Sequence, residues 1–168
     1  TMVLADGGAE VLKIEPPSGD WARSDPAFIM WHRGKKSVVL NLKSPKGQAH
    51  LRELAARADV LLTNSMPGVA KRLGLDHESL AKVNPGLVYC SITGFGPLKK
   101  FAHLKGYDAI VNTKTGRNGI FAKQIEKDGP AHAALMCGTF GAAMHAVQGT
   151  MAALRVRDRT GRGQKVET

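Results

Sequence analysis

Apolar positions along the chain follow two periods, one typical of strands and one typical of helices. Runs rich in apolar or β-branched residues predict strands at residues 9–14, 37–42, 59–63 and 87–92. Helical spacings and capping residues predict helices at residues 45–58, 67–73, 77–83 and 106–116. Polar stretches predict loops at residues 18–36 and 118–130.

The order of these elements predicts the fold class. Strands and helices alternate from residue 9 to residue 92, and the strand at 59–63 is apolar without polar alternation, which is typical of a parallel sheet. We therefore predict an α/β fold with a Rossmann-like parallel sheet flanked by helices. The strands at 9–14, 60–63 and 87–92 are predicted to be neighbours joined by right-handed crossovers.

The last long element is a helix predicted at residues 138–157. Large apolar side chains form one of its faces: Phe140, Met144, Val147, Met151 and Leu154. Small residues form a second face, which lets another backbone come close: Ala142, Ala146, Gly149 and Ala153. Thr139 is predicted to be the N-cap. The uncharged apolar stretch at 133–137 predicts that the helix begins in a buried place.

Length and composition narrow the classes of protein. The 168 residues fit one domain, and no uncharged apolar run approaches the roughly 20 residues of a membrane span. The N-terminus lacks the pattern of a signal peptide. Cys90 and Cys137 lie in apolar stretches and are predicted to be buried free thiols of a cytoplasmic protein. No Cys/His cluster has the spacing of zinc ligands.

The chain is basic, with 24 Lys and Arg against 14 Asp and Glu and a net charge of +10. This excess suggests an anionic partner. Nucleic acid fits poorly, because the basic residues are spread along the chain, aromatic residues are 5% and no nucleic-acid motif is present. A small molecule that carries phosphates fits better, and a solvated surface accounts for part of the excess.

Both ends of the chain lie inside predicted elements. Residues 2–5 have the pattern of the last turn of a helix closed by Gly7 and Gly8, and the final GQKVET has the pattern of a strand that begins. The sequence therefore predicts a fragment of a longer protein.

Six motifs occur in series along the chain: GAEVLKIEPP, RGKKSVVLNLKSPKG, ADVLLTNSMPGVAKRLGL, NPGLVYCSITGFG, KGYD and RTGRGQKVE. In this order and spacing the sequence resembles the family III CoA-transferases, which include formyl-CoA transferase, carnitine CoA-transferases and α-methylacyl-CoA racemase. The resemblance implies that residues 1–168 are part of the large domain, with the first strand upstream and the smaller domain downstream. It also implies an interlocked homodimer in which each chain threads through the other.

The resemblance implies coenzyme A as a substrate, with no permanently bound cofactor, and acyl-CoA and a small carboxylic acid as reactants. Asn64 and Arg72 match positions that hold the nucleotide end of CoA, and Leu40 and Leu42 match positions that line the adenine. Lys105 matches the basic residue of a K-x-Y motif. Arg and Lys recognise phosphate by charge-assisted hydrogen bonds, and an apolar floor suits an adenine ring.

The resemblance also implies the chemistry. In the transferases, an aspartate at the start of the long helix attacks the acyl-CoA thioester as a nucleophile. Thr139 stands at that position, and no Asp or Glu lies between Asp128 and Asp158. Tyr107 matches the transferases, since the racemases carry a histidine there, and Asp108 is left as a carboxylate near the thioester. Three functions stay open: a CoA-transferase, a non-catalytic CoA-binding or assembly subunit, and an acyl-CoA racemase.

Overall fold

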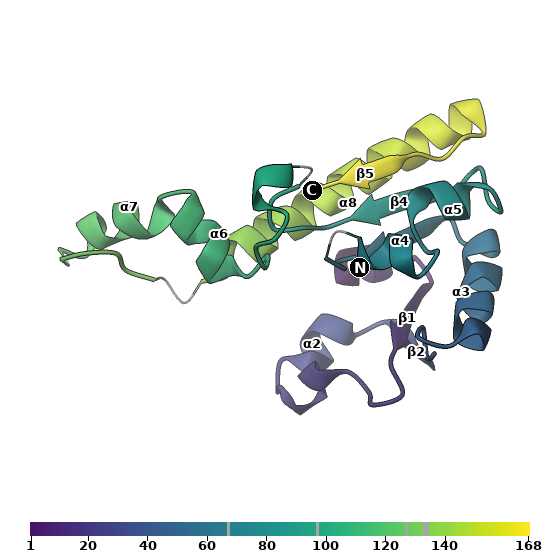
Figure 1. The fold of residues 1–168 in the computed structure, drawn as a ribbon, viewed down its shortest axis with the longest axis horizontal. Helices are drawn as coiled ribbons and strands as arrows, with labels where there is room; N and C mark the ends of the chain where they lie inside the picture. The colour runs from purple at the N-terminus through teal and green to yellow at the C-terminus, as the bar shows by residue number, and fades with distance from the viewer. Residues whose placement is uncertain (67, 97, 127, 133–134) are drawn as a thin grey trace.

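The chain folds into a mixed α/β structure, seen in a computed structural model that describes residues 1–66, 68–96, 98–126, 128–132 and 135–168 (Figure 1). The strands are β1 (Val11–Glu15), β2 (Lys35–Val39), β3 (Val60–Thr63), β4 (Val88–Ser91) and β5 (Lys165–Glu167). The first helices are α1 (Met2–Asp6), η1 (Trp21–Ser24), α2 (Phe28–His32), α3 (Pro45–Arg57), α4 (Val69–Arg72) and α5 (His77–Ala81). They are followed by η2 (Lys99–Phe101), α6 (Asp108–Lys114), α7 (Arg117–Gln124) and α8 (Cys137–Thr160).

All strand pairs are parallel, as the sequence predicts, but they form two sheets. One sheet has the order β1-β2 and the other the order β3-β4-β5. The predicted pairing of residues 60–63 with residues 87–92 is confirmed. The predicted place of residues 9–14 beside residues 60–63 is wrong, because β1 pairs with β2, and no ladder joins β1 to β3 in the described parts of the chain.

The main core lies between α3, α5 and β4. Its fully buried side chains are Ala55, Leu75, Leu80, Leu87 and Tyr89, with Leu42, Leu51, Ala58, Leu61 and Leu73 packed around them. Ser44 caps α3 as predicted, because its Oγ accepts a hydrogen bond of 3.1 Å from the N–H of Gly47. Pro45 at the first position of α3 has no backbone N–H, so one of the donors that a helix start leaves unpaired is absent.

Helix α8 packs on β4 and β5 through its small residues, not through its large ones. Ala146 and Ala153 are buried, and a Cβ placed on Gly149 would lie 2.7 Å from Cγ1 of Val166. Phe140 and Met144, from the predicted large apolar face, are about half exposed. The helix and the sheet therefore lie so close that only small side chains fit between them, and the large apolar face stays at the surface.

Several local predictions are wrong. The predicted loop at 18–36 contains η1 and α2, and the predicted loop at 118–130 contains α7. The side chain of Tyr107 is exposed instead of inward. Leu135 and Met136 are exposed as well, so α8 does not begin in a buried place there. Of the two cysteines, both free, only Cys90 is buried.

No helix in the part of the chain that the structure describes is long and apolar enough to cross a membrane. Among the same residues, no group of three or more His, Cys, Asp and Glu side chains lies close enough to hold a metal ion.

A buried charge cluster ties the segment after β1 to β2. The Glu15 carboxylate accepts hydrogen bonds from Arg23 Nε at 2.9 Å, Arg23 Nη2 at 2.8 Å and Ser37 Oγ at 2.8 Å. The Lys13 ammonium lies 3.2 Å from the same carboxylate and also pairs with Asp20. The hydrogen bonds from Arg23 and Ser37, together with Lys13, lower the pKa of Glu15 to about 2.

This cluster predicts acid sensitivity. Because the pKa of Glu15 is lower in the folded chain than its unfolded value of about 4.3, the carboxylate stabilises the fold above pH ~5. That contribution is lost as the pH falls towards 2. We expect Glu15→Gln to reduce stability at pH 7 and to flatten its loss between pH 5 and pH 2. Urea unfolding at several pH values measures this, with the exposed Glu53→Gln as the control; equal pH profiles for the two variants would contradict it.

Candidate functional site

Helix α8 runs against the direction of the strands, and its N-terminal end lies at their carboxyl edge (Figure 1). Near its C-terminus, Arg157 Nη1 donates a 2.7 Å hydrogen bond to Asp59, the residue before β3. Its middle packs on β4 and β5, so the first turns extend past the carboxyl ends of these strands. Open α/β sheets bind their ligands at this edge.

Thr139 lies in the first turn of α8 and is exposed. It falls on the same helical face as Ala146, Thr150 and Ala153, the buried residues that face the sheet. The first turn of α8 extends past the ends of the strands, so the helix face that carries Thr139 is open to the space beyond the carboxyl edge. The residue that matches the family's nucleophile is thus accessible there.

The carboxylate of Asp108 binds the start of α8. Its Oδ1 accepts a 3.0 Å hydrogen bond from the backbone N–H of Thr139. A Cβ on Gly138 would lie 2.4 Å from this oxygen, so glycine is what lets the carboxylate reach the backbone. A negative group at a helix N-terminus satisfies a free N–H and the helix dipole. The prediction of Thr139 as the N-cap is wrong, because α8 begins at Cys137 with Met136 as its N-cap; Asp108 supplies the capping carboxylate instead.

Asp108 contacts the backbone of Thr139 in this arrangement. Its hydrogen bond goes to the backbone N–H of that residue, not to the hydroxyl. Its other oxygen, Oδ2, is buried and has no hydrogen-bond partner among the described residues. Asp108 holds the first turn of α8 in place.

Two glycines bring the segment before α6 against the end of β4. A Cβ on Gly94 would lie 2.3 Å from the Cα of Gly106, so the two backbones touch. This contact places Lys105, Tyr107 and Asp108 beside the carboxyl edge. Lys105 Nζ lies 5.6 Å from the centre of the Tyr107 ring, and both side chains are exposed.

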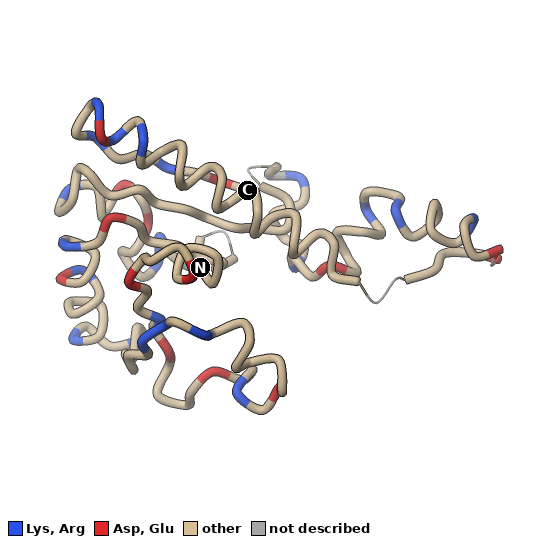
Figure 2. Tube along the Cα trace, turned by 180° about the vertical axis from the view of Figure 1, so that it is seen from behind, with Lys and Arg blue, Asp and Glu red and all other residues tan. Residues whose placement is uncertain are grey.

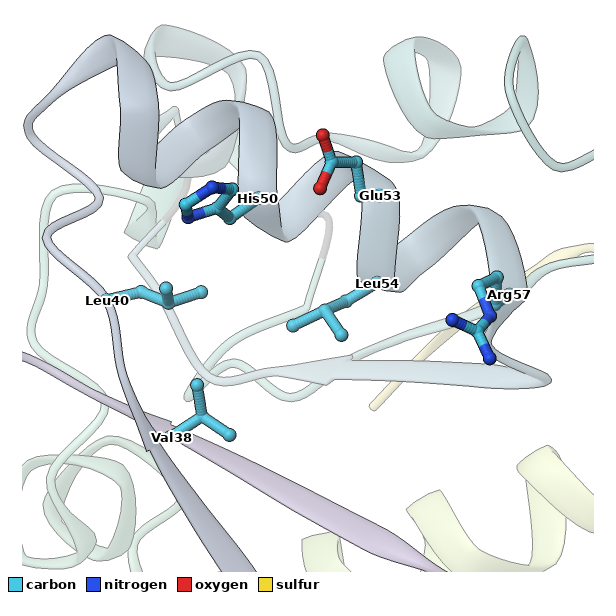
Figure 3. Close-up of a pocket in the computed structure, with 6 residues that line it drawn as sticks. All are labelled: Val38, Leu40, His50, Glu53, Leu54 and Arg57. Atoms are coloured by element: carbon cyan, nitrogen blue, oxygen red, sulfur yellow. The ribbon is translucent and has the colours of Figure 1, made fainter.

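The remaining candidate residues for CoA lie on three elements. Asn64 directly follows β3 and Arg72 ends α4, and both are exposed. Leu42 packs against the main core. Leu40 lies just past β2 in a surface hollow of about 300 Å³, shown in Figure 3 with the residues that line it: Val38, His50, Glu53, Leu54 and Arg57. Leu42 is not among the residues that line this hollow.

A polar hollow of about 280 Å³ lies on the face of β3, β4 and β5 that is turned away from α8. Its lining includes five hydroxyl side chains: Thr63, Ser65, Tyr89, Ser91 and Thr93. Sequence reasoning missed this face. The signal was the alternation of Val88 and Cys90 with Tyr89 and Ser91, since parallel strands buried on both faces are apolar throughout.

Known proteins share this sequence and fold. All residues from 1 to 168 match CoA-transferase family III, and the chain belongs to that family. It is 37% identical to succinyl-CoA:glutarate CoA-transferase of Mus musculus, over 97% of this chain and 39% of that protein. It is 38% identical to acetyl-CoA:oxalate CoA-transferase of Acetobacter aceti, over 99% of this chain and 45% of that protein.

Solved structures agree with the family. Rv3272 from M. tuberculosis superposes with a TM-score of 0.91 at 32% identity, over 99% of this chain and 47% of that one. A CAIB/BAIF family protein from Brucella suis superposes with a TM-score of 0.82 at 33% identity, over 98% and 47%. The chain spans less than half the length of these relatives.

Proposed function

We propose that the whole protein moves CoA from an acyl-CoA donor to a carboxylic acid acceptor, and that this chain is the CoA-binding part of its large domain. The match of residues 1–168 to CoA-transferase family III is the observation that carries the proposal. The names of the relatives, which act on glutarate and oxalate, support small carboxylic acids as acceptors.

CoA is proposed to lie along the carboxyl edge of β3 and β4, between α4 and the start of α8. Arg72 and Lys105 are exposed cations on elements that border this edge, and they suit the phosphates of CoA. Asn64 has an amide that can donate to and accept from a nucleotide. Of the two leucines, Leu40 is the better contact for the adenine, since it lines an open hollow while Leu42 belongs to the core.

Arg72→Ala tests this site. In the full-length protein we expect it to weaken CoA binding by about 1–3 kcal/mol, the range for a lost charged hydrogen bond. Isothermal titration calorimetry measures the affinity. Arg159→Ala is the matched control, because it removes the same charge from an exposed position near the other end of α8. Equal affinity in Arg72→Ala and the unchanged protein would remove Arg72 from the site.

A non-catalytic CoA-binding or assembly subunit is the second candidate, and Thr139 is the observation that favours it. A threonine hydroxyl is a weak nucleophile without a base. Asp108 is hydrogen-bonded to the backbone N–H of this residue and not to its hydroxyl. A threonine ester would also be too stable to pass its acyl group on. The chain as written is therefore proposed to bind CoA with little or no transferase activity.

The large domain is proposed to hold a further strand, supplied by the rest of the protein, between β1 and β3. Both flanking sheets are parallel, and in the described residues neither strand has a partner on that side.

We also propose an interlocked homodimer in the cytoplasm. The half-exposed apolar side chains farther along α8, Met151 and Val156, support burial by another chain. Light scattering that finds a stable monomer of the full-length protein would count against the dimer.

A further inference from the structure

An aromatic pair stands beside Thr139. The ring of Trp31 on α2 lies 5.5 Å from the ring of Phe140 on α8, with the planes 48° apart. Phe140 directly follows Thr139 in the first turns of α8. Trp31 is 38% exposed and Phe140 is 48% exposed, so the pair presents ring surface to solvent next to the accessible Thr139.

The apolar surface continues on both sides of the pair. Met30 precedes Trp31 on α2, and Met144 lies one helical turn after Phe140 on α8; both are about half exposed. We call these four residues, Met30, Trp31, Phe140 and Met144, the apolar wall. Such a surface next to a reaction site suits an apolar group, because burying it removes apolar area from water on both partners.

The Lys and Arg side chains that are close to Trp31 in the sequence already make ion pairs or hydrogen bonds. Lys13 pairs with Asp20 and Glu15, and Arg23 pairs with Glu15. Arg33 pairs with Asp6, and Lys36 pairs with Glu10. Lys35 donates a 2.8 Å hydrogen bond to the carbonyl of Trp31 itself. Of the five Lys and Arg side chains from Lys13 to Lys36, four therefore already pair with a carboxylate, and Lys35 is hydrogen-bonded to the backbone of Trp31.

We propose that Trp31 and Phe140 bind the acyl group of the acyl-CoA donor, and that this group is an apolar alkyl or aryl group, not one that ends in a second carboxylate. The inference rests on the proposed function, which places the thioester at the start of α8. An apolar acyl group would distinguish this protein from relatives whose names give succinyl-CoA as the donor. A carboxylate against the wall would lose water, and the side chains of Met30, Phe140 and Met144 offer it no hydrogen-bond donor.

Unreactive CoA thioethers test the acyl preference apart from any turnover. Ethyl-CoA, butyl-CoA and 3-carboxypropyl-CoA are titrated into the full-length protein by calorimetry. We expect butyl-CoA to bind about tenfold tighter than ethyl-CoA, from two further buried methylene groups. The carboxypropyl thioether is expected to bind no tighter than the ethyl one.

Substitutions assign this preference to the pair. Trp31→Ala and Phe140→Ala are each expected to remove most of the tenfold gain and to leave the affinity for CoA itself unchanged. Trp21→Ala, on a tryptophan that is 88% exposed in the same segment, and Met151→Ala, farther along α8, are the controls and are expected to keep the gain. Phe140→Arg is expected to bind carboxypropyl-CoA about tenfold tighter than the unchanged protein does, a gain that misfolding cannot produce.

The outcomes separate this inference from the proposed function. If CoA itself does not bind, the proposed function fails and this inference fails with it. If CoA binds but carboxypropyl-CoA binds tighter than butyl-CoA, the inference alone is overturned. A butyl gain that persists in both alanine variants also overturns it.

Discussion

Thr139→Asp is expected to raise CoA transfer by the full-length protein roughly a thousandfold or more, since loss of a covalent nucleophile costs at least that much in other enzymes. An aspartate carboxylate attacks the thioester carbonyl and forms a mixed anhydride while CoA leaves as the thiolate. The thiolate then attacks the enzyme's own acyl carbon, which gives an enzyme thioester and releases the donor acid. The acceptor carboxylate attacks that thioester, expels the CoA thiolate and forms a second anhydride with the enzyme. The thiolate then attacks the acceptor acyl carbon, which gives the acceptor's CoA thioester and frees the aspartate carboxylate.

The start of α8 suits this substitution. The position is exposed above the carboxyl edge, and the helix N-terminus stabilises a carboxylate there. Transfer is measured with a panel of acyl-CoA donors and carboxylic acids, and hydroxylamine traps the enzyme thioester. Thr139→Asn is the matched control, because asparagine has the shape of aspartate without its nucleophilic oxygen. Fast transfer by the threonine form, with no gain in Thr139→Asp, would show that the reaction uses another residue.

Gly94→Ala is expected to destabilise the chain by about 2 kcal/mol or more, within the range for overpacking a close contact. Its Cβ would fall 2.3 Å from the Cα of Gly106, and backbone atoms cannot rotate away as a side chain can. The segment with Lys105 and Asp108 would move off β4, so CoA affinity is expected to fall as well. Urea unfolding and calorimetry measure the two effects.

Gly141→Ala provides the comparison for Gly94→Ala. Gly141 lies inside α8 with no heavy atom within 4 Å of the position of an added Cβ. Alanine there is expected to stabilise the helix by about 0.5–1 kcal/mol, because glycine has the lower helix propensity. Similar losses of stability in both variants would mean that the contact between Gly94 and Gly106 is not what holds the segment.

The alternation of strand-like and helix-like apolar patterns along the chain was enough to predict the parallel α/β class and the pairing of β3 with β4. The same pattern assigned the wrong face of α8 to the core. Phe140 and Met144 carry more hydrophobicity than Ala146 and Gly149, but the distance between helix and sheet admits only the small residues. Helix α7 was missed because glycine and charged residues hide its short apolar stripe around Ala122, its one buried residue.

The candidate site was only partly predictable. Motif order gave Asn64, Arg72 and Lys105, all of which are exposed on elements that border the carboxyl edge. The role of Asp108 as the cap of α8 was not predictable, because Asp108 and Thr139 are 31 positions apart in the sequence and only the folded backbone brings them together. The contact of Trp31 with Phe140 joins two distant segments for the same reason.

The length of α8 limits how strongly the net charge of the chain attracts an anion at Thr139. At 24 residues the helix is about 36 Å long, and three arginines, Arg155, Arg157 and Arg159, lie towards its C-terminal end (Figure 2). At physiological ionic strength a charge is screened over about 8 Å. These arginines therefore stabilise the negative end of their own helix and exert almost no force on an anion at Thr139. The attraction of an anion to the site therefore depends on the few cations beside it, and not on the net charge of +10 of the whole chain.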